Sequence, residues 1–382
     1  MKRRSLSLVA ALLVLILSTP VQAHPYVTMT DSQKIELAKQ IGTQADESNY
    51  PLLIVMLDDP SWAVRQEAAE WIARANNPLF YPAILREYLT LAGKEGVPLS
   101  YTSAISRAMS GMGVAAVPHI AKWVDDPGVT AGQRAYLAWQ LGHLATKSGL
   151  VAESQDPVLV ATLRKLLKDS DWSVKLRAAG SLGRAGLNDG YDIAVEGLSL
   201  PPGFSRMVAA WALAFIPKDG TALALPVALD GLETSPDRAS LQEAIHALSN
   251  LAPRVTKEQR NQIADKMVPF TKHEEAGIRS VAVRAIGLTF DHSKADVVAD
   301  AMLHDADNET RFMGAQAFWQ WGRYHPALLE AVSDPYFPVR NWSLRALYKV
   351  PLTSEIRTVL LERQRAEPDK GLRDLIKVML AR

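Results

Sequence analysis

Histidine, serine and acidic side chains are the groups that could do chemistry in this chain, and their spacing matches no common catalytic or metal-binding pattern. No two of the eight histidines are four residues apart. The sequence therefore contains no HxxxH or HExxH helix, in which two imidazoles on one face bind a metal. His273 and Glu274 form the only His-Glu dipeptide. We predict no metal site and no cofactor.

Nucleophilic catalysis has no support in the sequence either. The chain has no cysteine, which excludes a thiol nucleophile, a disulfide and a zinc–thiolate cluster. No serine stands in a GxSxG context, and no glycine-rich loop has the setting of a phosphate-binding loop. The neighbouring carboxylates Asp58 and Asp59 stand at an expected turn, where acidic side chains commonly cap helices. We predict no catalytic residues and a protein that is not an enzyme.

The charge balance argues against a nucleic-acid partner. The 382 residues carry a formal net charge of +1, and removing Lys2, Arg3 and Arg4 with the N-terminal segment described next changes it to −2. Such a chain lacks the basic surface that binds phosphate backbones. Its hydrophobic content of 48% and charged content of 22% are typical of a folded protein.

The N-terminus has the pattern of a secretory signal peptide. MKRR is a basic region, LSLVAALLVLIL an apolar region and VQA a small-residue cleavage site that ends at Ala23. We predict a cleaved signal peptide over 1–23 rather than a membrane anchor, because Thr19, Pro20 and Gln22 follow a short apolar run. No later apolar run reaches the length of a membrane span, about 18 residues. The predicted location of the mature protein is the periplasm of a Gram-negative bacterium.

One pattern repeats along most of the chain and indicates which elements would position any site. A basic residue, taken as position 0, is followed seven residues later by a large apolar residue. Nine steps lead from Arg65 to Arg373, about 34 residues each, a period typical of solenoids. The pairs are Arg65–Ile72, Arg134–Leu141, Lys175–Leu182, Arg206–Leu213, Arg279–Ile286, Arg311–Phe318, Arg340–Leu347 and Arg373–Leu380, with weaker copies near residues 101 and 235.

The positions around the basic residue predict a pair of helices in each repeat. An acid at −6 and a Ser, Thr or Asp at −4 indicate a turn and an N-cap. Small residues at +3 and +4, such as Ala178 and Ala179, allow neighbouring helices to approach. Positions 0, +3, +4 and +7 share one helix face, so they belong to the second helix of a pair. We expect an all-α fold, a right-handed α-α superhelix (solenoid) of about ten helical-hairpin repeats.

Three segments follow from this pattern. They are the signal peptide 1–23, an N-terminal segment 24–49 with a capping helix over 31–42, and a repeat solenoid 50–382 that includes C-terminal capping helices. The stretches AGKEGVPL and KSGLVAESQDP are expected to be loops between helices rather than domain boundaries.

The phrases LDDPSWAVRQEAAEWI, LLKDSDWSVKLRAAGSLG and LHDADNETRFMGAQAF resemble HEAT repeats of the HEAT-like class also labelled phycobilisome-lyase-like, an armadillo-type fold. The resemblance covers most of 50–382 and implies a fold rather than a function. In that family the acid and the basic residue six positions later form a ladder between successive repeats. The resemblance implies this role for Asp59 with Arg65, Asp169 with Lys175, Asp305 with Arg311 and Asp334 with Arg340. Leu200 and His273 replace the acid in two repeats, which predicts an interrupted ladder.

Positions +2 and +5 lie roughly opposite the packed face of each second helix, because each residue turns a helix by about 100°. Solenoids bind partners on the concave face that these helices line. The side chains there are rich in Trp and Arg, which are typical interface anchors, although they could instead pack between neighbouring helices. These eight residues, which we call the stripe, are Tyr136, Trp139, Arg177, Trp211, Arg284, Met313, Trp342 and Arg345.

The predicted function is a periplasmic scaffold or adaptor that binds a protein partner of the cell envelope on the stripe, with no catalysis of its own. Two alternatives stay open. Histidines and acids that only the fold brings together could form a lyase- or oxidoreductase-like enzyme or a cofactor- or metal-binding site. The aromatic side chains could instead bind an envelope glycan or a small ligand.

Overall fold

The computed structural model describes residues 25–91, 97–147 and 156–382. Within them it contains 21 α-helices, short 3-10 segments between some of these, and no β-strand. The predicted signal peptide 1–23 and most of the two predicted loops, residues 92–96 and 148–155, lie outside the described residues. None of the helices in the described ranges combines the length and apolar character that crossing a membrane requires.

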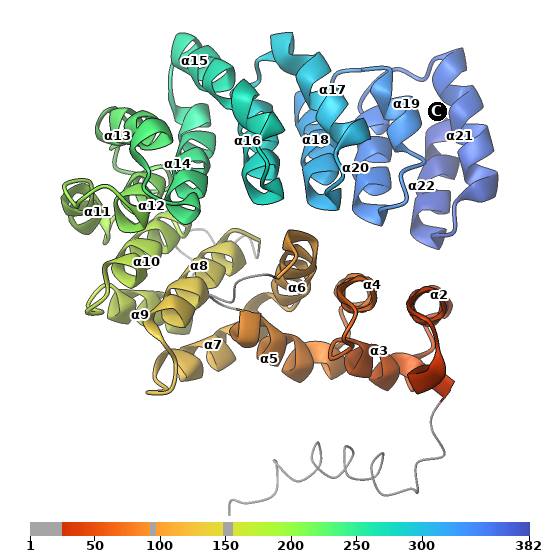
Figure 1. Cartoon of the computed structure of the whole chain (residues 1–382), viewed down its shortest axis with the longest axis horizontal. Coiled ribbons are helices and arrows are strands. Elements are labelled where there is room, and N and C mark those ends of the chain that lie inside the picture. The colour runs from red at the N-terminus through yellow and green to blue at the C-terminus, as the bar shows by residue number, and fades with distance from the viewer. Residues whose placement is uncertain (1–24, 92–96, 148–155) are drawn as a thin grey trace, which may run out of the picture. The chain divides into compact units, whose positions relative to one another are not determined.

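The helices form two units, residues 1–75 and 76–382 (Figure 1). Unit 1 contains α2 (Asp31–Gln44), α3 (Tyr50–Met56) and α4 (Trp62–Ala75). Unit 2 contains α5 (Tyr81–Leu91), α6 (Leu99–Gly111), α7 (Val117–Val124), α8 (Ala131–Lys147), α9 (Pro157–Leu166), α10 (Trp172–Arg184), α11 (Tyr191–Gly197), α12 (Phe204–Leu213), α13 (Thr221–Thr234), α14 (Arg238–Leu251), α15 (Lys257–Met267), α16 (Ala276–Thr289), α17 (Ala295–His304), α18 (Asn308–Trp321), α19 (Ala327–Ala331), α20 (Phe337–Tyr348), α21 (Ser354–Ala366) and α22 (Lys370–Leu380).

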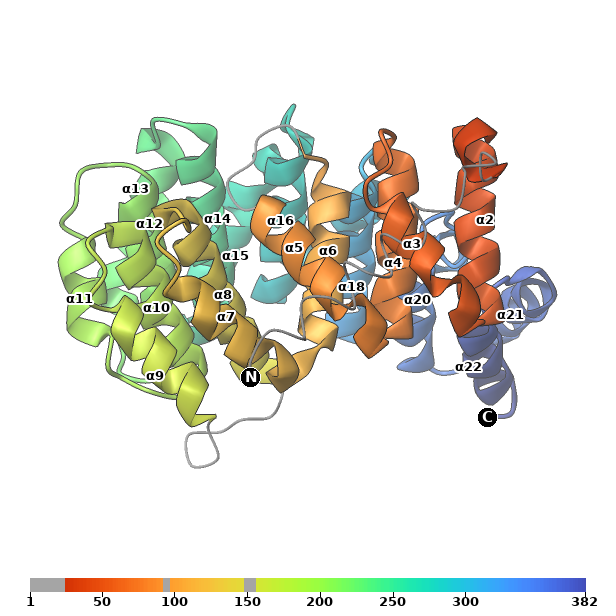
Figure 2. The ribbon, with the colours of Figure 1, turned by 90° about the horizontal axis from the view of Figure 1, so that it is seen from below.

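From α3 onward the helices alternate between the first and the second helix of a repeat, which makes ten pairs, α3–α4 to α21–α22. In unit 2 the even-numbered helices are the second helices, and each packs against the next even-numbered helix along the chain. Figure 2 shows α10, α12 and α14 as neighbours in this row. The predicted all-α solenoid of about ten hairpin repeats is confirmed, while the hand of the superhelix stays a prediction.

Aspartate N-caps start many of the second helices, as the −4 position of the repeat predicts. Asp171 accepts hydrogen bonds from the main-chain N–H groups of Ser173 and Val174. Asp369 accepts one from Leu372 at 2.9 Å. Each such cap stabilises its helix by about 1 kcal/mol, because the first N–H groups of a helix have no partner within it. The repeat therefore encodes its own helix starts.

The large apolar residue at +7 forms the core between the two helix layers. Seven of the eight residues at this position are at most 2% exposed, which shows that the repeat predicted the core face of the second helices correctly. These residues are Ile72, Leu141, Leu182, Leu213, Ile286, Phe318 and Leu347.

Candidate binding surface

Ion pairs join repeats in a ladder, but with different partners from those predicted. Arg311 Nε donates to Asp334 Oδ2 of the following repeat at 2.8 Å, whereas Arg311 Nη1 donates to the main-chain oxygen of Asp305 in its own repeat at 2.9 Å. The predicted ion pair between Asp305 and Arg311 is therefore wrong, and that between Asp334 and Arg340 is wrong in the same way. The other rungs are Arg134–Asp169 and Arg279–Asp305, both at 2.7 Å, and Arg340–Glu367 at 3.0 Å.

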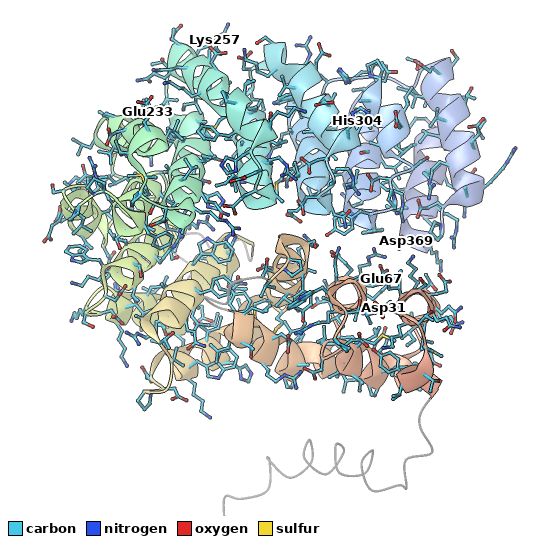
Figure 3. The ribbon with its side chains drawn as sticks, in the orientation of Figure 1. Asp31, Glu67, Glu233, Lys257, His304 and Asp369 are labelled. Atoms are coloured by element: carbon cyan, nitrogen blue, oxygen red, sulfur yellow. The ribbon has the colours of Figure 1, made fainter. Side chains whose placement is uncertain are left out.

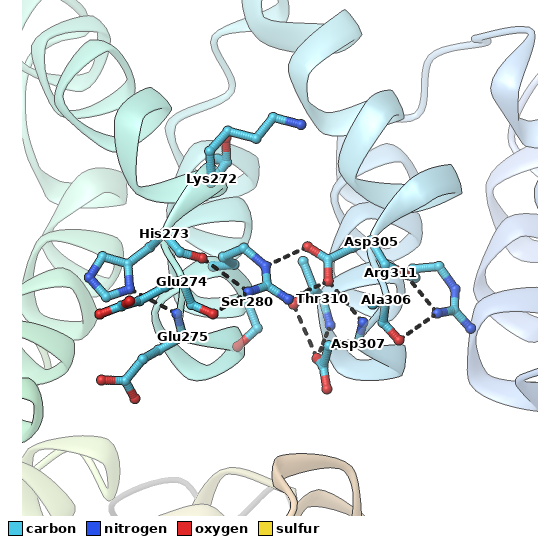
Figure 4. Close-up of polar contacts among 12 residues, drawn as sticks. Lys272, His273, Glu274, Glu275, Ser280, Asp305, Ala306, Asp307, Thr310 and Arg311 are labelled. Atoms are coloured by element: carbon cyan, nitrogen blue, oxygen red, sulfur yellow. Dashed lines mark hydrogen bonds and ion pairs between the residues drawn. The ribbon is translucent and has the colours of Figure 1, made fainter.

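The turn before each second helix explains this exchange of partners. Asp305 Oδ1 accepts the main-chain N–H of Asp307 at 2.9 Å, and Asp307 Oδ2 accepts that of Thr310 at 2.8 Å (Figure 4). The Asp305 carboxylate thus closes its own turn and binds the arginine of the preceding repeat, so the arginine six residues later reaches only the carbonyl oxygen. His273 takes the place of the acid one repeat earlier, and its Nδ1 accepts the N–H of Glu275 at 3.1 Å.

The predicted pair of Asp169 with Lys175 is also replaced. Asp169 binds Arg134 instead, and the Lys175 ammonium lies 4.6 Å from the centroid of the Trp172 ring. Burial raises the pKa of Asp169, but the hydrogen bonds from Arg134 offset this, and the pKa lies below its ordinary value. The following repeat has Leu200 at the acid position. Lys175 therefore meets no carboxylate there, and the ladder is interrupted between α10 and α12.

Asp59 in unit 1 also binds other residues than its predicted partner, Arg65. Its Oδ2 accepts hydrogen bonds from the Tyr26 hydroxyl at 2.5 Å and from Lys34 Nζ at 2.9 Å. The Arg65 guanidinium lies 4.4 Å from the centroid of the Trp62 ring. The buried Asp59 carboxylate thus binds the N-terminal residues that precede α3, where an arginine of a preceding repeat would otherwise stand.

The stripe divides into buried, half-buried and exposed side chains. Trp211 on α12 is 2% exposed, so it cannot contact a partner directly, and its predicted place on the surface is corrected. Arg345 on α20 is exposed. Half-buried side chains occupy the remaining stripe positions, Tyr136, Trp139, Arg177, Arg284, Met313 and Trp342.

Trp211 is buried because the neighbouring helix leaves room for it. Gly180 occupies the +5 position on α10, and a Cβ there would lie 2.3 Å from Trp211 Cζ3. The indole therefore fills the space that any larger residue at position 180 would take.

The half-buried aromatic rings of the stripe contact one another. The Tyr136 ring stacks on Tyr88 with a centroid distance of 4.3 Å and on Trp139 with one of 5.6 Å. The Trp342 ring meets Trp319 edge to face at 4.6 Å. Packing of this kind holds the rings in fixed orientations, so they form a rigid surface.

Charged side chains from three helices converge beside Trp211. We call Arg177 and Arg184 of α10, Glu243 of α14 and Arg284 of α16 the arginine cluster. Arg177 binds Glu243 through two parallel hydrogen bonds, Nη1–Oε1 at 2.9 Å and Nη2–Oε2 at 2.6 Å. The two side chains are 12% and 4% exposed, and the Arg177 guanidinium lies 4.6 Å from the Trp211 ring centroid.

The surroundings of the cluster shift the pKa values of its members. Burial raises the pKa of Glu243, but the charge of Arg177 and the contact with His246 outweigh it and lower the pKa to about 2. Burial lowers the pKa of Arg284 to about 10. Glu243 is thus ionised and Arg284 is protonated at neutral pH. No group of three or more His, Cys, Asp or Glu in the described ranges is arranged to hold a metal ion.

A family model supports the repeat assignment. The HEAT repeat model matches residues 50–74, which span α3 and α4. This match agrees with the resemblance of the repeats to the HEAT-like class. No curated protein matches it.

Two solved structures are similar to this chain at low sequence identity. One is the complex of CpcE and CpcF of phycocyanin lyase from Nostoc sp. PCC7120, with 16% identity, a TM-score of 0.41, and coverage of 69% of this chain and 94% of that chain. The other comes from work on a phosphorylation switch that controls the interaction between cadherin and beta-catenin. It has 16% identity, a TM-score of 0.33, and coverage of 82% of this chain and 70% of that chain. TM-scores this low carry no functional argument.

The predicted stripe does not include two members of the arginine cluster, Arg184 and Glu243. Glu243 occupies position +5 of the weak repeat copy that begins at Arg238, which is the sequence signal for its place on this face. Arg184 lies seven residues after Arg177, two turns along the same helix face. The sequence does not indicate that Arg184 lies near Arg284, because the two residues are 100 positions apart.

Proposed function

We propose that this chain is a periplasmic HEAT-repeat adaptor that binds a protein partner on the second helices of unit 2 and has no catalytic activity of its own. The observation that carries the proposal is the content of the stripe and the arginine cluster beside it. Half-buried Trp, Tyr and Arg side chains lie there in packed rows. These residue types dominate binding energy at protein interfaces, and helical repeat proteins present such extended surfaces to partners. The signal-peptide pattern of residues 1–23 supports the location.

The first helices of the repeats have a different surface. Glu233 on α13 and Lys257 on α15 are exposed polar residues on this outer layer (Figure 3). Glu233 pairs there with Lys266 at 3.2 Å, with both side chains at least half exposed. Exposed pairs of this kind add little to stability or affinity, so the outer layer is a suitable control surface.

Site-specific photo-crosslinking in cells tests the proposal. A benzophenone amino acid replaces Tyr136, Trp342 or Arg345 on the second helices, and Glu233 or Lys257 on the first helices. Mass spectrometry then identifies what is attached. The same protein should be captured from all three stripe positions and from neither outer position. Capture from the outer positions alone, or a purified protein with a stoichiometric metal or a visible chromophore, would overturn the proposal.

A further inference from the structure

Arg184 is a half-buried charged side chain whose guanidinium has no hydrogen-bond acceptor among the described residues. It ends α10, and its guanidinium lies 4.1 Å from the centroid of the Phe215 ring and 5.2 Å from that of Trp211. Its Nε is buried, and no atom of the described residues accepts a hydrogen bond from it. Guanidinium groups in proteins normally use several of their five N–H donors. Leaving a desolvated charge unpaired is costly, so an anion that accepts hydrogen bonds from Arg184 would stabilise this arrangement.

The arginine cluster has more positive than negative charge. Its three guanidiniums share one carboxylate, Glu243, and both oxygens of that carboxylate bind Arg177. Arg284 donates to neutral oxygens instead, to Ser249 Oγ at 2.8 Å and to Asn250 Oδ1 at 3.2 Å. In the part of the chain that the structure describes, neither Arg184 nor Arg284 has a carboxylate within salt-bridge distance. Two of the three charges are therefore uncompensated.

The positive charge of Arg284 also acts on Arg184. Burial, together with the charges of Arg284 and Arg177, lowers the pKa of Arg184 to about 9, although the charge of Glu243 acts in the opposite direction. Arg184 stays protonated at neutral pH in spite of this repulsion. An anion placed between the two guanidiniums would relieve it and would supply acceptors for their N–H groups.

We propose that Arg184 and Arg284 form a binding site for a carboxylate on an acidic segment of the protein partner. The inference rests on the proposed adaptor function and names the chemistry of the partner. The favoured ligand is a carboxylate because the cluster already binds one: Glu243 and Arg177 form a planar, two-bond pair in the same surroundings. The Trp211 and Phe215 rings beside Arg184 fix the plane of the guanidinium and therefore favour a planar anion.

Fluorescence anisotropy with a labelled hexaglutamate peptide tests this site in the purified full chain. The variants are R184Q and R284Q, with R164Q as the matched control. Arg164 lies on α9, the first helix of the same repeat, and pairs with Asp189 at 2.6 Å. We expect Kd to rise about tenfold or more in R184Q and R284Q, the usual effect of losing a charge-assisted hydrogen bond. Kd should stay unchanged in R164Q. R184K keeps the positive charge but lacks the planar guanidinium that can donate two parallel hydrogen bonds. Its Kd should lie between those of wild type and R184Q.

Three outcomes would overturn the inference. In the first, R184Q and R284Q bind hexaglutamate as tightly as wild type does. In the second, a hexalysine peptide binds equally well. In the third, inorganic phosphate binds in an Arg184-dependent way and hexaglutamate does not bind, which would assign the site to a free anion.

The crosslinking experiment separates this inference from the proposed function. If the stripe captures the same protein in R184Q as in wild type and to the same extent, the carboxylate site is wrong and the adaptor function stands. If the stripe captures nothing in wild type, the adaptor function fails, whatever the peptide does.

Discussion

Removing the buried ion pair of Arg177 and Glu243 should lower the stability of the folded protein by an amount that can be worked out from the structure. In E243Q the amide keeps the size of the side chain but removes the negative charge that the Arg177 guanidinium binds. The pKa of Glu243 falls from an ordinary value of 4.5 to about 2 in the folded protein. At about 1.4 kcal/mol per pKa unit this corresponds to about 3 kcal/mol of stability. The same magnitude, about 3–5 kcal/mol, is typical when one partner of a buried ion pair is removed.

The effect should depend on pH with a defined sign. Because folding lowers the pKa of this carboxyl, its stabilisation is complete above about pH 4.5 and is lost as the pH falls towards 2. E243Q lacks the carboxyl group at position 243 that titrates in this pH range. The free energies of unfolding of wild type and E243Q should therefore differ by about 3 kcal/mol at pH 7 and approach each other between pH 4.5 and 2.

Urea unfolding followed by tryptophan fluorescence and far-UV circular dichroism, at pH 7, 4 and 2.5, measures both effects. The control is E233Q on α13, where the carboxylate is 75% exposed and pairs with Lys266. Its stability should change by less than about 0.5 kcal/mol at each pH. A loss in E243Q of less than about 1 kcal/mol at pH 7 would refute the reasoning. So would a difference of constant size across the three pH values, since it would not come from the carboxyl group.

Two further substitutions test the packing and the ladder. G180A should destabilise the protein by about 1–3 kcal/mol in urea unfolding, since the new Cβ would lie 2.3 Å from the buried Trp211 ring. G132A on α8, where a Cβ meets no atom within 4 Å, should instead be neutral or stabilising by up to about 1 kcal/mol, and equal effects at the two glycines would contradict the packing argument. R311Q should cost about 3 kcal/mol, because it leaves Asp334 without the guanidinium that binds it at 2.8 Å. R345Q, at an exposed arginine, should change the same unfolding curve by less than about 0.5 kcal/mol, and a loss in R311Q as small as this would show that the ladder does not stabilise the repeats.

The repeat itself could be predicted from the sequence because its signals are local. An aspartate cap such as Asp171 acts within three residues, and the apolar positions follow the 3.6-residue turn of one helix. Their recurrence about every 34 residues then indicates a stack of helix pairs. These short-range rules determined the all-α fold, the number of repeats, the start of the second helices and the core residues at +7.

The partners of charged side chains were decided by the tertiary structure. Arg311 binds Asp334, 23 residues away in the next repeat, rather than the nearer Asp305, because the Asp305 carboxylate already closes its own turn. Trp211 is buried rather than exposed because a different helix has a glycine opposite it. Neither fact follows from the position of a residue on its own helix.

In the arginine cluster, too, the sequence determined the helix face of a residue and the tertiary structure decided its partner. Helix periodicity placed Arg177 and Arg284 on the correct face. It could not show that Arg177 pairs with Glu243, or that Arg184 and Arg284 pair with no carboxylate of the described residues. Charge pairing depends on distances between side chains of α10, α14 and α16, and the stacking of the helices sets those distances. The sequence by itself determined the helical repeats and the kinds of residue on their second helices. The tertiary structure decided which charged side chains are paired.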